Sequence, residues 1–154
     1  MKPNTFSRLY AHCIFCPEGR DSVLTDPART KIYKYIYGTI NGKSCFPLAI
    51  NGTENHIHIL FGFRPSTCIA EIMRDIKRSS SLFINENRLV PGRFRWQDGY
   101  GAFTVGYIDL DRVYNYILNQ EIHHSKQNFR EEYYKILEQE GFENYENYLF
   151  EFYE

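Results

Sequence analysis

Two histidines that flank one apolar residue, in the run His56-Ile57-His58, are the clearest chemical signal in the sequence. Side chains alternate across a β-strand, so histidines at positions i and i+2 point to the same face. Their Cα atoms lie about 6–7 Å apart in a strand, which lets two imidazole rings converge on one metal ion. The pattern therefore indicates a metal site, and the alternative is an ordinary pair of histidines in a strand.

A second group of polar side chains falls in residues 110–126, where the pattern predicts a helix. Tyr116 and Gln120 are about one helical turn apart, and His123 lies within about 20° of Tyr116 around the helix axis. An aromatic ring, an amide and an imidazole make a poor core seam, so this stripe is either a solvated face or a reactive one. A phenol has a pKa of about 10, so Tyr116 needs assistance before it can act as a nucleophile.

Hydrophobic patterning predicts the elements that position these side chains. Expected strands cover residues 7–16, 46–51, 55–63 and 103–107, and expected helices cover 26–38, 68–83, 110–126 and 129–139. Asp26 and Thr67 are expected N-caps, and Asn51-Gly52 is expected to form a hairpin turn. The order β-α-β-β-α-β predicts an α+β, ferredoxin-like fold with an antiparallel sheet and an appended C-terminal helix that carries Tyr116.

The overall composition is that of an ordinary globular protein. The chain has 154 residues, 43% hydrophobic and 24% charged, which fits one domain spanning residues 1–154. Aromatic residues reach 17%, and such side chains both build cores and stack on unpaired bases. No segment has the roughly 18 apolar residues of a membrane span, and the N-terminus lacks a signal-peptide pattern, so we expect a cytoplasmic protein.

Charge and cysteine content set limits on function. The net charge of −1 provides no global attraction for nucleic acid, so such contacts must depend on local basic groups. Cys13 and Cys16 form a C-x-x-C without a second pair, which favours reduced thiols over a redox or zinc site. The basic candidates for phosphate contact, with a solvated surface as the alternative, are Arg74, Lys77, Arg78, Arg93 and Arg95.

Six segments spread over nearly the whole chain match a known pattern. They are Tyr10-Ala-His-Cys-Ile-Phe, Gly52-Thr-Glu-Asn-His-Ile-His-Ile-Leu, Ile76-Lys-Arg-Ser-Ser, Trp96-Gln-Asp-Gly-Tyr-Gly-Ala-Phe, Tyr116-Ile-Leu-Asn-Gln-Glu-Ile-His-His and Phe129-Arg-Glu-Glu-Tyr. Together they resemble the single-tyrosine HUH transposases, small enzymes of short insertion sequences and of their repeat-associated relatives in bacteria. In this comparison U is the apolar Ile57, and Asn55 stands where these enzymes often have Asp.

The resemblance implies a chemistry for the two polar groups. His56, His58 and Gln120 become ligands of Mg²⁺ or Mn²⁺, Tyr116 becomes the nucleophile, and the helical stripe makes His123 an auxiliary candidate. The implied reaction cuts single-stranded DNA, leaves a 5′-phosphotyrosine and a free 3′-hydroxyl, and rejoins strands in transposition. Tyr114 and Tyr107 are rival nucleophiles, but Tyr114 does not share the Gln120 face of the helix.

The resemblance also implies partners. They are single-stranded DNA with hairpins near the ends of an element, and a second copy of the chain. In that homodimer the catalytic helix of one subunit docks on the HUH strand of the other. We expect neither a membrane nor a small-molecule substrate. Trp96 and Tyr100 are candidates for stacking on a base, with core packing as the alternative.

Two other functions fit parts of the pattern. A non-enzymatic single-strand-binding module would use the aromatic residues on the sheet and need neither a metal nor Tyr116. A strand nickase domesticated by its host would keep the same chemistry without mobility. A binding module would not cut DNA, so cleavage distinguishes it from a transposase. Hairpins just inside both ends of the flanking DNA would favour a mobile element over a domesticated nickase.

Overall fold

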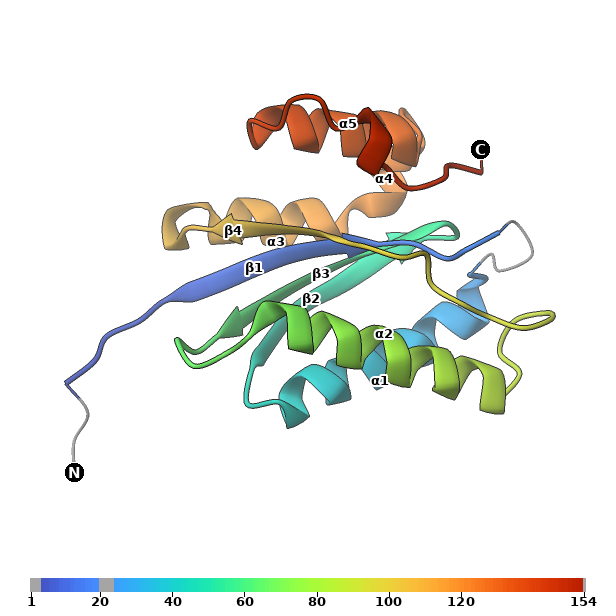
Figure 1. The fold of residues 1–154 in the computed structure, drawn as a ribbon, viewed down its shortest axis with the longest axis horizontal. Helices are drawn as coiled ribbons and strands as arrows, with labels where there is room; N and C mark the ends of the chain where they lie inside the picture. The colour runs from blue at the N-terminus through green and yellow to red at the C-terminus, as the bar shows by residue number, and fades with distance from the viewer. Residues whose placement is uncertain (1–3, 20–23, 154) are drawn as a thin grey trace.

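Four antiparallel strands form the centre of the computed structural model, which describes residues 4–19 and 24–153 (Figure 1). They are β1 (Leu9–Phe15), β2 (Phe46–Thr53), β3 (His56–Phe63) and β4 (Gly101–Val105). The order across the sheet is β2-β3-β1-β4. The two central strands are therefore β3 and β1, and the HUH histidines lie on the first of these.

Helices cover both faces of this sheet (Figure 1). On one side lie α1 (Asp26–Gly42) and α2 (Ile69–Glu86), and on the other lie α3 (Leu110–Leu118), α4 (Gln120–His124) and α5 (Phe129–Gln139). Two short 3-10 turns, η2 (Tyr107–Asp109) and η3 (Glu146–Tyr148), complete the described elements. The arrangement confirms the predicted α+β, ferredoxin-like fold with appended C-terminal helices.

The alternation of β3 divides its side chains between the two sides of the sheet. Ile57, Ile59 and Phe61 are buried in the larger apolar cluster, together with residues of α1 and α2. Leu60 belongs to a smaller apolar cluster that includes residues of α3. The histidines alternate with the three apolar residues of the larger cluster, as the period-2 pattern predicts.

The helix starts differ from the prediction by one residue. Thr25 is the N-cap of α1, so that Asp26 is its first helical residue and Pro27 follows in the first turn. Cys68 is the N-cap of α2, while the Thr67 hydroxyl accepts a hydrogen bond from a loop backbone N–H instead. The two predicted capping side chains thus have other partners, a loop backbone N–H for Thr67 and the Arg29 guanidinium for Asp26, which sequence patterns alone do not reveal.

The hairpin turn between β2 and β3 falls at residues 54–55, so the prediction of a turn at Asn51-Gly52 is wrong. Gly52 lies within β2, and a Cβ atom built there would stand 2.1 Å from the backbone oxygen of His56. The glycine therefore permits a close approach of the two strands rather than a turn. This approach brings β2 against the start of the HUH strand.

The remaining broad expectations concern cysteines and membranes. All four cysteines are free, and burial raises the pKa of the Cys13 and Cys16 thiols to about 12. Both therefore remain protonated. Among the helices in residues 4–19 and 24–153, none combines the length and the apolar character needed to cross a membrane.

Candidate active site

His56 and His58 are fully buried on β3. Their ring centroids are 5.0 Å apart, with the ring planes nearly perpendicular. Strand geometry alone explains why they meet, because residues two apart on one strand share a face. The remaining site residues come from α3, α4 and α5.

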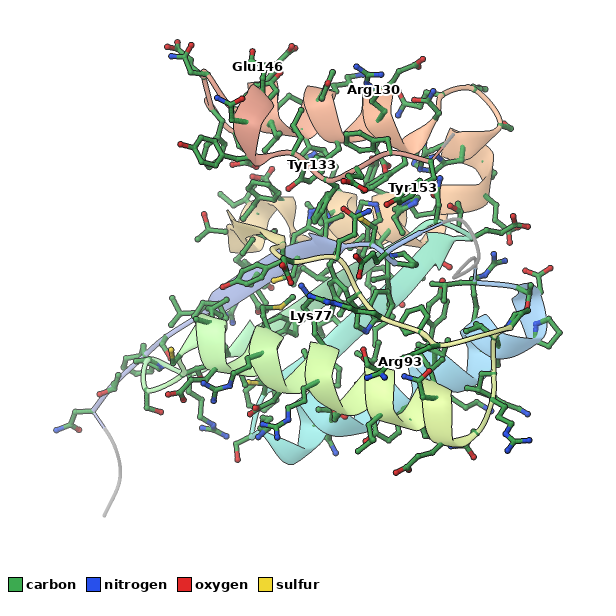
Figure 2. The ribbon with its side chains drawn as sticks, turned by 45° about the vertical axis from the view of Figure 1, so that its right-hand side comes forward. Lys77, Arg93, Arg130, Tyr133, Glu146 and Tyr153 are labelled. Carbon is green, nitrogen blue, oxygen red and sulfur yellow. The ribbon has the colours of Figure 1, made fainter. Side chains whose placement is uncertain are left out.

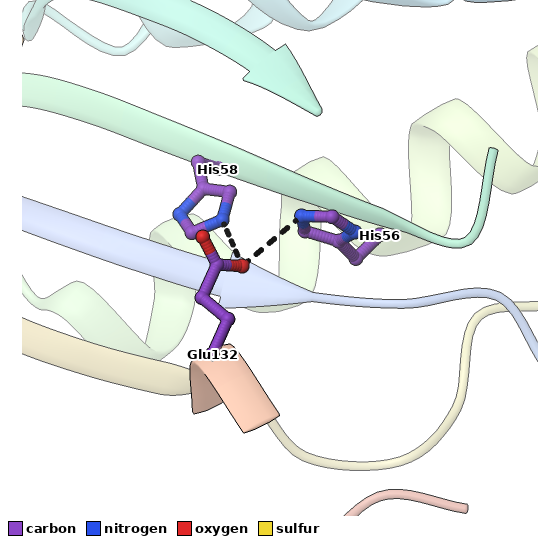
Figure 3. A group of neighbouring side chains, drawn as sticks. All are labelled: His56, His58 and Glu132. Carbon is purple, nitrogen blue, oxygen red and sulfur yellow. Dashed lines mark hydrogen bonds and ion pairs between the residues drawn. The ribbon is translucent and has the colours of Figure 1, made fainter. Parts of the chain in front are cut away.

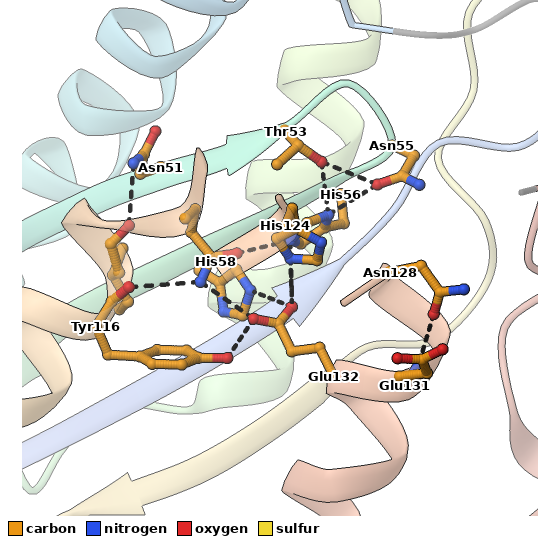
Figure 4. Close-up of polar contacts among 12 residues, drawn as sticks. Asn51, Thr53, Asn55, His56, His58, Tyr116, His124, Asn128, Glu131 and Glu132 are labelled. Carbon is orange, nitrogen blue, oxygen red and sulfur yellow. Dashed lines mark hydrogen bonds and ion pairs between the residues drawn. The ribbon is translucent and has the colours of Figure 1, made fainter. Parts of the chain in front are cut away.

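Residues at the hairpin turn contact the Nδ1 atom of His56 (Figure 4). Its Nδ1 lies 2.9 Å from Asn55 Oδ1 and 3.1 Å from Thr53 Oγ1, and the Thr53 hydroxyl also donates to Asn55 Oδ1. An amide oxygen can only accept a hydrogen bond, so His56 carries its proton on Nδ1. Its Nε2 lone pair then faces the interior of the site. Asn55 thus orients this imidazole without a carboxylate.

Tyr116 and Gln120 lie on α3 and α4, which replace the single long helix predicted from the sequence. The Asn51 side chain on β2 donates to the backbone carbonyls of Ile117 and Leu118, at 3.0 and 3.1 Å. These are carbonyls at the C-terminal end of α3, which a continuing helix would satisfy internally. The interruption keeps Gln120 close to Tyr116, whose backbone carbonyl lies 3.5 Å from the Gln120 Nε2.

Glu132 of α5 lies between the two histidines and is 1% exposed (Figure 3). Its Oε1 is 3.2 Å from His58 Nε2 and 3.3 Å from His56 Nε2. His124 Nε2 lies 3.0 Å from the same oxygen. Three imidazole nitrogens therefore surround one carboxylate oxygen.

The second oxygen of Glu132 contacts the candidate nucleophile. Oε2 accepts hydrogen bonds from the Tyr116 hydroxyl and, at 3.2 Å, from Gln120 Nε2 (Figure 4). Because its amide nitrogen donates to Glu132, Gln120 turns its Oε1 toward His56, where it lies 2.9 Å from Nε2. One buried carboxylate thus links Tyr116, the amide and both HUH histidines.

Three hydrogen-bond acceptors meet in the site with no proton between them. They are His56 Nε2, Gln120 Oε1 and Glu132 Oε1. Burial lowers the pKa of His56 to about 4, although the nearby Glu132 carboxylate opposes the shift, so the ring is neutral. Its Nε2 lone pair then faces the amide oxygen of Gln120 and the carboxylate. Buried acceptors that face one another are unfavourable unless a cation lies between them.

The donor set fits a divalent metal ion. His56, His58 and Glu132 each offer one ligand atom, and these atoms lie within 4.8 Å of one another. Ligands about 2.1 Å from an ion and at right angles to each other are about 3 Å apart, close to the separations of 2.9–3.3 Å found here. The described residues therefore contain a candidate metal site with nitrogen and oxygen ligands.

Burial and hydrogen bonding fix the charge of the site. Burial raises the pKa of Tyr116 well above its ordinary value, and the nearby Glu132 carboxylate adds to this. Burial would also raise the pKa of Glu132, but the surrounding imidazoles of His124, His56 and His58 outweigh this effect and hold that pKa well below its usual range. The site therefore contains an ionised carboxylate and a protonated phenol.

A groove of about 740 Å³ leads from the surface to Tyr116. Residues of β4 and of α3, α4 and α5 line it, and Glu132 and Tyr116 are part of its wall. Two cationic side chains, Arg112 of α3 and Lys135 of α5, also line the groove, and both residues are exposed. The groove therefore makes part of the Tyr116 side chain accessible from the surface.

Residues 5–120 match the family described as "Transposase IS200 like". The chain belongs to the IS200-like transposase family. The match covers His56, His58, Tyr116 and Gln120, and it ends before α5. Glu132 therefore lies outside the part of the chain that the family pattern describes.

Two solved structures share the fold of this transposase. A crystal structure from Deinococcus radiodurans R1, assigned as a transposase, is 19% identical, with a TM-score of 0.60 over 78% of this chain and 96% of that one. The REP-associated tyrosine transposase bound to a REP hairpin is 13% identical, with a TM-score of 0.60 over 80% of this chain and 74% of that one. No curated protein matches the chain.

The basic residues singled out from the sequence lie away from Tyr116. Arg74, Lys77 and Arg78 are on α2, which covers the other side of the sheet from α3, α4 and α5 (Figure 1). Lys77 points toward the segment before β4 (Figure 2), and its Nζ donates to backbone carbonyls there at 2.6 and 2.7 Å. Arg93 and Arg95 are both exposed, and Arg95 also pairs with two carboxylates.

The histidine, tyrosine and tryptophan candidates differ in burial and in the residues that they contact. His123 stacks on the Tyr116 ring with centroids 4.6 Å apart, and its buried Nε2 has no hydrogen-bond partner. Tyr114 is 37% exposed and Tyr107 is 60% exposed. Trp96 is buried and donates to a serine hydroxyl, so of the two alternatives for this residue the structure has core packing rather than base stacking.

Glu132 and His124 are the site residues that the sequence reasoning missed. The signal for Glu132 is its position on α5, where Phe129, Tyr133 and Leu137 form the buried face. An acidic residue at i+3 of an otherwise apolar helical stripe is rarely buried without a partner. The signal for His124 is weaker, because it follows His123 on the same short helix.

Proposed function

We propose that this transposase cuts and rejoins single-stranded DNA through a covalent bond to Tyr116. The observation that carries the proposal is the hydrogen bond of the Tyr116 hydroxyl to Glu132, inside the cluster of His56 and His58. A nucleophile, an acceptor for its proton and a metal-ligand set are thus adjacent. Tyr114, two residues away, is exposed and has no such contact described.

The metal proposed for this site is Mg²⁺ or Mn²⁺, held by His56, His58, Gln120 and Glu132. Two imidazole nitrogens and two oxygens leave coordination positions for a phosphate, and the oxygens favour these ions over a closed structural zinc site. Glu132 adds a negative charge to the ligand set inferred from the sequence. When bound, the ion polarises phosphoryl oxygens and stabilises charge on the leaving oxygen.

In the proposed reaction the Tyr116 oxygen attacks the phosphorus of a phosphodiester. The Tyr116 O–P bond forms while the bond from phosphorus to the 3′-oxygen breaks, and the 3′-oxygen takes up one proton from solvent for the one that Tyr116 gives up, so the step has no net change in protons. The phenolic proton already lies on the hydrogen bond to Glu132 Oε2, which is placed to accept it. The 5′-phosphotyrosine keeps the energy of the phosphodiester, so a second 3′-hydroxyl can reverse the step without ATP.

The groove beside Tyr116 supports a path for the strand that is cut. Arg112 and Lys135 lie on α3 and α5 and line the groove together with Tyr116. Basic side chains there can contact backbone phosphates without reading sequence. A chain of this size and a net charge of −1 has little phosphate-binding energy with which to open a duplex, where extruding one base costs roughly a few kcal/mol.

Hairpins are the proposed recognition element, as in the REP hairpin bound by the related structure. The exposed Arg74, Arg78 and Arg93 lie away from the groove and are the proposed phosphate contacts for the folded part of the DNA. Lys77 and Arg95 are engaged within the protein and are less available for this role. The two sets of basic residues would hold the hairpin and the cut strand separately.

A homodimer is proposed for the protein in solution, with a site that each chain completes for itself. The structure brings Tyr116 and Gln120 to His56 of the same chain, so the exchange of helices implied by the resemblance is not needed to assemble the site. An outer stripe on α3 and α4, made of Tyr114, Leu118 and Ile122, exposes apolar surface that suits a second copy. Light scattering of wild type and Leu118→Glu tests it, since the variant should be monomeric.

The proposed function is tested with one cognate sequence presented in three forms. A single strand and a hairpin with a single-stranded flank should be cut in the presence of Mn²⁺, and a perfect duplex should stay intact. Tyr116→Phe should abolish cutting, whereas the control Tyr114→Phe should not. Efficient duplex cutting contradicts the proposed mechanism, and tight binding without any cutting favours a non-enzymatic binding module.

A further inference from the structure

A third buried histidine lies behind the HUH pair. His12 is on β1, the strand that pairs antiparallel with β3, and it is 7% exposed. Its Nε2 lies 2.7 Å from His58 Nδ1, and the two rings stack with centroids 5.0 Å apart. His12 therefore contacts the nitrogen of His58 that points away from Glu132.

The direction of this hydrogen bond depends on what the other nitrogen of His58 contacts. Without a metal, His58 Nε2 lies 3.2 Å from the Glu132 carboxylate and must donate to it. Its Nδ1 is then an acceptor, so that His12 Nε2–H is the donor. A metal ligand needs the lone pair at Nε2, which moves the proton of His58 to Nδ1 and requires His12 Nε2 to accept it.

Histidine is well suited to this double role. A neutral imidazole donates or accepts at the same nitrogen by changing tautomer, with no change in its charge. His12 is 7% exposed and lies against a second imidazole, and both conditions favour its neutral form. His12 also lines the groove that leads to Tyr116, where the proton of its second nitrogen can exchange with water.

The partner of the other HUH histidine has no such freedom. Asn55 Oδ1 can only accept from His56 Nδ1, which fixes that ring in one tautomer with or without a metal. The two histidines of the motif therefore differ in their support. One is held permanently as a ligand, and the other can alternate between a carboxylate donor and a metal ligand.

We propose that His12 is a positioning residue that sets the tautomer of His58, donating to it in the metal-free protein and accepting from it when a metal is bound. This inference depends on the proposed metal site. The proposal adds His12 of β1 to the active site. This residue belongs neither to the HUH motif nor to the proposed metal ligands. Removing the acceptor at position 12 should weaken metal binding about 10- to 100-fold, the usual effect of losing such a partner.

The first test titrates Mn²⁺ into the metal-free protein by calorimetry. His12→Leu removes the acceptor and should weaken affinity about 10- to 100-fold, whereas His12→Gln keeps an amide that can accept or donate and should stay within about threefold of wild type. Thermal melts establish that both variants are folded. Equal affinity of wild type and a folded His12→Leu overturns the role of His12 but leaves the metal site intact. Absence of binding by wild type refutes the proposed metal site itself.

The second test observes the tautomers directly by long-range ¹H–¹⁵N NMR of the imidazoles. In metal-free wild type, His58 and His12 should both carry their proton on Nε2, and saturating Mg²⁺ should move both protons to Nδ1. His56 should remain protonated on Nδ1 throughout. A His58 tautomer that is the same with and without Mg²⁺, or one that changes equally in His12→Leu, overturns the proposal.

Discussion

The two sides of the sheet use buried side chains for different purposes. On the side of α1 and α2, apolar residues such as Ile57, Ile59 and Phe61 fill the larger cluster. On the side of α3 to α5, His56, Glu132 and other polar groups are buried between the helices and the sheet. Both sides contribute apolar stabilisation, because the larger cluster also includes Phe129, Tyr133 and Leu137 of α5, but the second side alone contains the candidate active site among the described residues.

This difference teaches that stability and reactivity are separable in this fold. Burying each large apolar side chain contributes roughly 1.5–3 kcal/mol, whereas buried polar groups recover their desolvation cost only through complete hydrogen bonding. The larger cluster can therefore keep the chain folded when polar residues of the candidate site are substituted. Substitutions on the two sides should accordingly have different consequences.

The largest expected effect is on the polar side, in the double variant His56→Ala with His58→Ala. Metal binding and DNA cutting should both disappear, because the two nitrogen ligands are lost together. Calorimetric titration with Mn²⁺ and a cleavage assay measure the two losses, and a thermal melt should show a folded protein. Full metal affinity in this double variant would contradict the proposal that His56 and His58 bind the metal.

A truncation in the apolar cluster should have the opposite profile. Ile59→Ala removes a fully buried side chain and should lower the free energy of unfolding by about 2–5 kcal/mol. Metal affinity measured well below the melting temperature should remain within about twofold of wild type. A loss of metal affinity that exceeds the fraction unfolded would show that the two sides are coupled.

The third effect concerns the ligand that the family pattern does not include. Glu132→Gln keeps the shape of the side chain but removes the charge, and it should weaken Mn²⁺ binding about tenfold or more because a charged ligand is lost. The adjacent Glu131→Gln is the matched control, since Glu131 is exposed on the same helix turn (Figure 4). Equal affinities of the two variants would remove Glu132 from the ligand set.

The smallest expected effect is on the α2 side, at the surface. Arg74→Ala and Arg78→Ala should each reduce the slope of log affinity against log salt by about one, because each removes one phosphate contact. Lys31 is exposed on α1, and Lys31→Ala serves as a control that should leave the slope unchanged. Slopes equal to wild type in both arginine variants would exclude this face from hairpin binding.

Sequence patterns predicted the parts of the molecule that depend on local periodicity. The alternation of β3 places His56 and His58 together, and the extent of α5 was predicted correctly because its apolar spacing is strong. Tyr116 and Gln120 were paired by helical spacing, and they lie next to the HUH histidines. These features need only the period of one element.

The features that were missed depend on contacts between distant segments. Asn51 ends α3 through a contact across 66 residues of sequence, so no local pattern marks the break. Glu132 reaches His58 across 74 residues, and only the packing of α5 determines that its carboxylate enters the site. His12 is similar, because its partner lies on a neighbouring strand whose register the sequence does not state.

The most direct test of the account is the identity of the residue that becomes bound to DNA. A labelled single strand with a cognate site, incubated with the protein and Mn²⁺, should give an adduct that survives denaturation. Digestion and mass spectrometry should place the 5′-phosphate on Tyr116, and Tyr116→Phe should form no adduct. An adduct on another residue, or one that persists in Tyr116→Phe, contradicts the central claim that Tyr116 is the nucleophile.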